Sequence, residues 1–186
     1  AHPDDLYCQS GEMILWDLSE GLISSSVIPV HAHNVWALVF SPDGETLATG
    51  SADETIQLWD ITSGEPVGDP ILGHEGGVTS LAFSPDGEVL ASSGLDAVIQ
   101  LIDLESRQRL GPPLLGHDDI VNNIAFSPKG DWLVSVSHDT NIFLWNMDIE
   151  DWIEIGCERA GRNLSQSEWQ RYFVEAPYES TCSHFQ

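Results

Sequence analysis

Residues 73–103 read GHEGGVTSLAFSPDGEVLASSGLDAVIQLID, and this stretch decides the fold because its pattern returns along the chain. Its turn, Ser84-Pro85-Asp86-Gly87, has counterparts at Ser41-Pro42-Asp43-Gly44 and Ser127-Pro128-Lys129-Gly130. The pair that ends each unit recurs in the same way, as Trp16-Asp17, Trp59-Asp60, Ile102-Asp103 and Trp145-Asn146. Both series step by 43 residues, so the chain is built from repeats.

Each repeat contains the signals of four short strands. In the middle unit, β-branched and aromatic residues predict strands over 78–83, 89–93 and 98–102, with a weaker one over 109–114. Proline presets φ in the turn and Asp-Gly lets the chain reverse, so the first two strands are antiparallel neighbours. A period of roughly 40 to 45 residues with four strands per unit is typical of a β-propeller blade.

The repeats set the expected domain organisation. We expect blades over residues 1–147: a partial blade over 1–30, then units starting near 31, 74 and 117. Counting back one period from His31 passes the start of the chain, so the first unit lacks its opening strand and begins around residues 6–10. The fold class is therefore all-β, an incomplete propeller ring of about three and a half four-stranded antiparallel blades. We expect the rest of the propeller to come from a longer parent chain or from a second copy.

Residues 148–186 do not follow the repeat. Trp152 and Ile155 begin a short helical stripe, and Ser165-Gln166-Ser167-Glu168 is a capping-box signal before Trp169. We expect this tail to form short helices that cap the last blade, since terminal units of repeat arrays need caps.

The amino-acid composition restricts the kinds of partner and cofactor that the chain could bind. Six basic against 30 acidic residues give a formal charge of -24, which disfavours binding to nucleic acid and anionic membranes and favours a protein or peptide partner, with a cationic partner as one candidate. No apolar run is long enough to span a bilayer, and a cytoplasmic location is expected. Cys8, Cys157 and Cys182 lack the spacing of a zinc site, so no metal or cofactor is expected. Cys157 and Cys182 either pair or stay as buried thiols.

The Gly-His dipeptides, the Ser-Pro-Asp-Gly turns, the turn aspartates and the final Trp-Asp pairs together resemble the WD-repeat β-propeller family. The resemblance implies a hydrogen-bonded tetrad in each blade, made of a histidine, a Ser or Thr, an aspartate and a tryptophan. Two units match it fully, and the middle unit has isoleucine in place of the tryptophan. The matching residues are His31, Thr49, Asp53 and Trp59; His74, Ser92 and Asp96, with Ile102; and His117, Ser135, Asp139 and Trp145. Without an indole N–H donor for Ser92, we expect the middle blade to be the least stable.

A Ser, His and Asp set also permits a catalytic interpretation, with Ser135 as nucleophile, His117 as base and Asp139 as the residue that orients it. That chemistry needs an exposed hydroxyl and an oxyanion hole, for which the sequence gives no signal. Recurrence of the set every 43 residues favours a structural network.

The resemblance also implies where a partner binds, at the rim of the central channel. The matching positions are Trp36, Thr79 and Asn122 at the start of the first strands, and Ala52, Leu95 and His138 just before the turn aspartates. An aromatic such as Trp36 at a concave rim is a typical interface anchor.

The tail over residues 157–182, with its Cys, Trp and Tyr residues, resembles the segment that follows the repeats in bacterial, notably cyanobacterial, WD-repeat proteins. The combined interpretation is a non-catalytic interaction scaffold or sensor within a larger signalling or regulatory protein. The alternatives are a hydrolase that uses the Ser/His/Asp set and a self-assembling half propeller.

Overall fold

The computed structural model describes residues 11–17 and 24–147, and all of its regular structure is β-sheet. The chain divides into two compact units, Ala1–Leu144 and Trp145–Gln186, and only 145–147 of the second are described. The expected strand start at 6–10 and the expected helical tail over 148–186, with its cysteines, lie outside the described residues.

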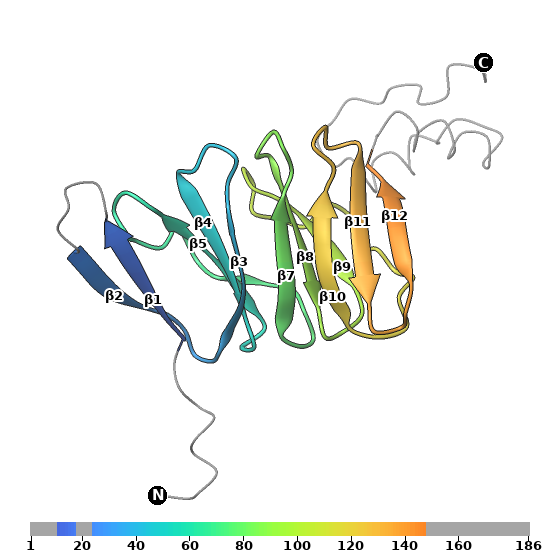
Figure 1. Cartoon of the computed structure of the whole chain (residues 1–186), viewed down its shortest axis with the longest axis horizontal. Coiled ribbons are helices and arrows are strands. Elements are labelled where there is room, and N and C mark those ends of the chain that lie inside the picture. Colours follow the sequence, from blue (N-terminus) through green and yellow to red (C-terminus); the bar gives the residue numbers. More distant parts are fainter. Residues whose placement is uncertain (1–10, 18–23, 148–186) are drawn as a thin grey trace, which may run out of the picture. The chain divides into compact units, whose positions relative to one another are not determined.

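Four antiparallel sheets follow one another along the chain (Figure 1). The first pairs β1 (Gly11–Asp17) with β2 (Ser24–His31). The second has the order β3-β4-β5-β6, the third β7-β8-β9 and the fourth β10-β11-β12. We call these sheets the first to fourth blades. The remaining strands are β3 (Val35–Phe40), β4 (Thr46–Ser51), β5 (Thr55–Asp60), β6 (Ile71–Leu72), β7 (Val78–Phe83), β8 (Val89–Gly94), β9 (Ile99–Asp103), β10 (Val121–Phe126), β11 (Trp132–Ser137) and β12 (Ile142–Asn146).

The all-β prediction and the antiparallel blades are confirmed for the described residues. In the third blade, the strands lie within one residue of the predicted 78–83, 89–93 and 98–102. The weak fourth strand is reduced to two isolated bridges, Ile102 with Arg109 and Ile99 with Leu114.

The Ser-Pro-Asp-Gly segments make the turns that the sequence predicts. Gly44 N–H donates to Ser41 O at 2.9 Å, and Gly87 N–H to Ser84 O at the same distance. Gly44 has φ +76° and Gly87 has φ +78°, a left-handed conformation that costs other residues about 1 to 2 kcal/mol. The turn therefore needs the glycine as well as the proline.

The core lies between neighbouring blades. Ile56 and Leu58 on β5 are buried against the next blade, which contributes Val78 and Leu81 from its inner strand β7. The inner strands β3, β7 and β10 lie next to one another (Figure 1). Polar bonds join two of them, since Ser80 Oγ–H donates to Asn123 Oδ1 at 2.9 Å and the Thr79 hydroxyl donates to Val121 O.

Blade-to-blade packing predicts unequal costs at equivalent positions. Leu81→Ala should lower the free energy of unfolding by about 2 to 5 kcal/mol, because it leaves a cavity at the interface. In the monomer, at low protein concentration, Leu38→Ala, one period earlier, should cost about 0.5 kcal/mol or less, because Leu38 is 66% exposed within one chain and Leu81 only 6%. Urea unfolding followed by tryptophan fluorescence measures both variants, and equal losses would contradict the packing described.

Candidate functional site

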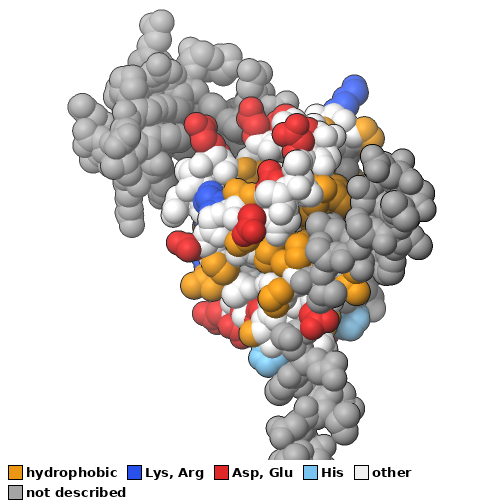
Figure 2. Space-filling view, turned by 90° about the vertical axis from the view of Figure 1, so that its left-hand side faces the viewer, with side chains coloured by type: hydrophobic (Ala, Val, Ile, Leu, Met, Phe, Trp, Pro, Cys, Tyr) orange, Lys and Arg blue, Asp and Glu red, His pale blue; other side chains and the backbone are white. Residues whose placement is uncertain are grey.

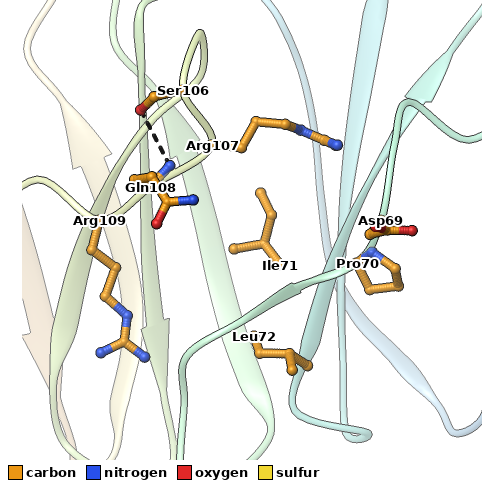
Figure 3. A pocket seen from close by; sticks show the side chains of 8 residues that line it. All are labelled: Asp69, Pro70, Ile71, Leu72, Ser106, Arg107, Gln108 and Arg109. Atoms are coloured by element: carbon orange, nitrogen blue, oxygen red, sulfur yellow. Dashed lines mark hydrogen bonds between the residues drawn. The ribbon is translucent and has the colours of Figure 1, made fainter.

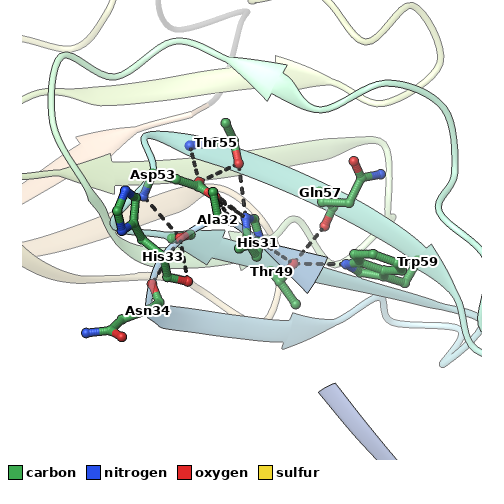
Figure 4. A network of polar contacts seen from close by, with 10 residues as sticks. His31, Ala32, His33, Asn34, Thr49, Asp53, Thr55, Gln57 and Trp59 are labelled. Atoms are coloured by element: carbon green, nitrogen blue, oxygen red, sulfur yellow. Dashed lines mark hydrogen bonds and ion pairs between the residues drawn. The ribbon is translucent and has the colours of Figure 1, made fainter. Parts of the chain in front are cut away.

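A buried histidine precedes each of β3, β7 and β10 and anchors a polar network in the second, third and fourth blades. Figure 4 shows the network of the second blade, whose histidine, His31, is the last residue of β2. His31 Nδ1 faces the Asp53 carboxylate, 3.1 Å from Oδ2, so this nitrogen carries the proton and donates. His31 Nε2 then accepts from the Thr49 hydroxyl at 2.8 Å. Trp59 Nε1–H donates to the same Thr49 oxygen at 2.9 Å. The four residues predicted as a tetrad are therefore brought together.

The same network recurs in the third and fourth blades. His74 Nδ1 lies 2.9 Å from Asp96 Oδ1, and its Nε2 lies 2.9 Å from Ser92 Oγ. Ile102 occupies the tryptophan position and is buried in the apolar core, so it supplies packing and no N–H donor. The lower stability expected for this blade stays a prediction.

In the fourth blade, His117 Nδ1 lies 2.7 Å from Asp139 Oδ2 and its Nε2 lies 2.8 Å from Ser135 Oγ. Trp145 lies on β12, as the repeat predicts. The His117 ring also stacks against Phe143, with ring centroids 4.4 Å apart.

The aspartates are the outer members of these networks and reach back to the main chain. Burial raises the pKa of the Asp53 carboxyl, but the Thr55 hydroxyl, the Ala32 N–H and the His31 ring outweigh it and hold the pKa below its usual value. Burial also raises the pKa of the Asp139 carboxyl, but the N–H donors of Asn141 and Asp118 and the His117 ring outweigh burial and lower the pKa. Each ionised aspartate thus ties the residue after the histidine to the turn that follows the second strand.

Geometry alone would let His117 act as a base for Ser135. However, Ser135 and Ser92 have no solvent-exposed surface, and Thr49 is only 3% exposed. A substrate carbonyl cannot reach these oxygens in this conformation, because attack requires contact with the hydroxyl. The networks hold the blades together and give the hydrolase alternative no support.

The residues predicted to contact a partner fall into two groups. Trp36, Thr79 and Asn122, one on each inner strand, line a common groove of about 370 Å³. Leu95 and His138 lie outside that lining, on exposed turns whose N–H groups donate to Gly77 O and Ile120 O. Ala52 is equivalent to them and donates to Asn34 O.

The Trp36 side chain is partly exposed to solvent and also packs against the main chain at Gly77. Its side chain is 47% exposed, and its ring lies so close to Gly77 that a Cβ there would sit 2.2 Å from Trp36 Cζ3. Gly77 therefore keeps open the space over which the ring lies. The structure gives Thr79 a second role that the sequence did not predict, because its hydroxyl donates to Val121 O between blades.

Two further polar residues that line the groove were not predicted from the sequence. Ser80 and Asn123 project from neighbouring inner strands and bond to each other. One signal was available, since the adjacent Asn122 and Asn123 interrupt an otherwise apolar strand. Among the described residues, no group of three or more His, Cys, Asp or Glu side chains is arranged to hold a metal ion.

The same repeats appear when the chain is compared with protein-family models. The WD domain, G-beta repeat model matches three times, at residues 23–60, 64–103 and 110–146, which is more than half of the sequence. The chain belongs to the WD40 family. No curated protein matches it significantly. WD40 domains typically serve as non-catalytic scaffolds for protein–protein interaction, and the buried WD40 networks described above agree with that role. Within the described ranges, no helix is long and apolar enough to cross a bilayer.

The lowered aspartate pKa values predict a pH dependence of stability. A carboxyl whose folded pKa lies below the unfolded value of 3.8 stabilises the fold above that pH, and the contribution is lost as the pH falls through the folded pKa. The double variant Asp53→Asn/Asp139→Asn should therefore melt at a lower temperature at pH 7 and lose less on acidification from pH 5 to 3 than the original chain. Thermal melting monitored by circular dichroism measures this, with exposed Asp69→Asn as the control. Parallel pH profiles for all three proteins would contradict the assignment.

Proposed function

We propose that the chain is a non-catalytic interaction module that binds a cationic segment of a partner protein at the groove lined by Trp36, Thr79 and Asn122. The observation that carries this proposal is the convergence of three non-identical side chains, one from each inner strand, on one hollow. Trp36 offers a half-exposed indole face, and Thr79 and Asn122 offer neutral hydrogen-bonding groups.

The charge around the groove supports a cationic partner. The loops that precede the inner strands and the turns that follow the second strands carry carboxylates and no Lys or Arg. These carboxylates belong to Asp53, Glu54, Glu75, Asp96, Asp118, Asp119 and Asp139. In Figure 2, acidic side chains are spread over the visible surface while Lys and Arg are few. A Lys or Arg side chain gains both from this field and from a cation–π contact with an indole, worth about 0.5 to 2 kcal/mol.

The wider setting is also a proposal. The resemblance of residues 157–182 to the tails of bacterial WD-repeat proteins supports a place within a larger bacterial signalling or regulatory protein. The three widely spaced cysteines support a reducing, cytoplasmic environment.

Two matched tryptophans test the binding site. Trp36→Ala should weaken binding of a fluorescein-labelled, ten-residue Lys- and Arg-rich peptide by about thirtyfold, the loss of about 2 kcal/mol typical of an aromatic anchor. Trp132→Ala is the control, because Trp132 is exposed to a similar degree, 42% against 47%, but lies outside the groove. Fluorescence anisotropy gives both affinities. Equal effects of the two substitutions, or none at Trp36, would refute the site.

A second function, self-assembly, is favoured by the exposure of two blade faces. Leu38 on β3 is 66% exposed although β1 and β2 precede it in the chain, whereas its equivalents Leu81 and Ile124 are 6% and 3% exposed. On β12, Ile142 is 63% exposed, whereas its equivalent Ile56 is buried against a following blade. Equivalent apolar residues pack against each other between neighbouring blades of one chain. The two exposed faces could therefore pack against those of a second copy, which would bury both.

Mass in solution tests self-assembly. The 186-residue chain should elute as a discrete dimer by size exclusion with light scattering, and Leu38→Glu should convert it to a folded monomer because a charge would be buried at the interface. Leu72→Glu, at a site 71% exposed, is the control and should leave the dimer intact. A monomer at every concentration would rule out self-assembly without bearing on the Trp36 site.

A further inference from the structure

A second hollow lies between the outer parts of the second and third blades. It has a volume of about 630 Å³ and is lined by residues 69–72, which include β6, and by residues 106–109 of the next repeat (Figure 3). Arg107 and Arg109 lie on one wall, and Ile71 lies between them (Figure 3). We call this hollow the arginine cleft.

The two arginines are placed by backbone carbonyls and not by acids. Arg107 donates to Val67 O, and Arg109 Nη2 donates to Gly73 O at 3.1 Å. Across the residues that the structure describes, neither guanidinium forms an ion pair with an Asp or Glu. A guanidinium has five N–H donors, so each keeps donors for an anion beyond the one that holds it in place. This is notable in a chain with 30 acidic and six basic residues.

Arg107 also occupies a backbone position that favours glycine. Its φ is +60°, and one period earlier the same turn has Gly64 at φ +72°. The two turns match in detail, since Ser63 N–H donates to Asp60 Oδ1 and Ser106 N–H donates to Asp103 Oδ1, both at 2.7 Å. A non-glycine residue in the left-handed region costs about 1 to 2 kcal/mol. The third blade thus carries a strained arginine where the second blade uses glycine.

The facing wall suits an extended peptide. Strand β6 is the outermost strand of its sheet, and no other strand of the described ranges pairs with its free edge. Leu72 is 71% exposed, which leaves an apolar surface beside that edge. A peptide strand added there gains main-chain hydrogen bonds, while side chains give specificity. The guanidiniums contact opposite ends of the segment 67–73, so they would meet carboxylates near both ends of such a peptide.

We propose that the arginine cleft binds an extended acidic peptide, with carboxylates on Arg107 and Arg109 and an apolar residue over Ile71 and Leu72. The site does not depend on the groove at Trp36 and selects a ligand of opposite charge. Asp69 is the one acidic residue in its lining and opposes such a ligand.

The test uses the full 186-residue chain and an end-capped, fluorescein-labelled peptide, Glu-Glu-Thr-Val-Thr-Glu-Glu, in about 0.15 M salt, where the screening length is about 8 Å. The original chain should bind it, and the Gln-for-Glu peptide should bind at least tenfold more weakly. Arg107→Gly and Arg109→Gln should each weaken binding at least tenfold. Lys129→Gln, which removes one positive charge outside the cleft, should leave binding unchanged.

Two variants separate binding from folding. Arg107→Gly should melt no lower than the original chain, because Gly64 adopts the same conformation in the equivalent turn. Asp69→Asn should tighten binding severalfold, which a misfolded protein cannot do. Trp36→Ala should leave this peptide bound, so failure of one site is distinguishable from failure of the other. The proposal is overturned if the Glu peptide does not bind, if Arg107→Gly leaves its affinity unchanged, or if inorganic phosphate displaces it with equal affinity, since the last result means a simple anion site.

Discussion

The buried hydroxyl on the middle strand of each repeat is the constraint on which the rest of the structure depends. Thr49, Ser92 and Ser135 are all removed from solvent, and a buried hydroxyl without a partner costs about 1 to 3 kcal/mol. The histidine satisfies it through Nε2, which obliges Nδ1 to find an acceptor in the turn aspartate. The aspartate in turn accepts the N–H of the residue after the histidine. Satisfying one hydroxyl therefore fixes the start of each inner strand relative to the turn beside it.

The proposed binding groove depends on that fixed geometry. The inner strands come together in register because each is held by its own network, and bonds such as Ser80 to Asn123 join neighbours. Positions separated by one period must then converge, whatever residues occupy them. Trp36, Thr79 and Asn122 are equivalent in the frame and different in chemistry. In the proposed groove, the repeat fixes where the three side chains lie, and the differences between the units would decide which ligand is recognised.

Periodicity explains how much the sequence could predict. Strands and turns depend on spacing within a unit, so the 43-residue period located the first three strands of the third blade to within one residue. The fourth strand, predicted over 109–114, is reduced to two bridges, and the tetrad residues came from the resemblance to the WD-repeat family. Of the six rim positions that the resemblance implied, Trp36, Thr79 and Asn122 line the groove, and Ala52, Leu95 and His138 do not. The arginine cleft was not predicted, because it joins non-equivalent positions: carbonyls at Val67 and Gly73 in one repeat and side chains two residues apart in the next. One signal for this cleft was present in the sequence, because Arg107 occupies the position that is equivalent to Gly64 one period earlier. Only the positive φ angle of Arg107 shows that this position favours glycine. The hydrogen bond from Thr79 to Val121 O was not predicted either, because it also joins non-equivalent positions of neighbouring repeats.

The two candidate sites differ in how a ligand would reach them. A net charge of -24 attracts a cation at long range, so association at the acidic rim is steered and should slow as salt screens the field. An anion approaching the arginine cleft is first repelled by the same field and gains only from short contacts with the guanidiniums. Salt therefore affects its two stages oppositely, easing the approach and weakening the final pairs. For a cationic ligand, a higher salt concentration weakens both the long-range attraction during approach and the short-range charge pairs in the complex. The sign and steepness of the salt dependence of the association rate thus distinguish the two sites even before either partner is identified.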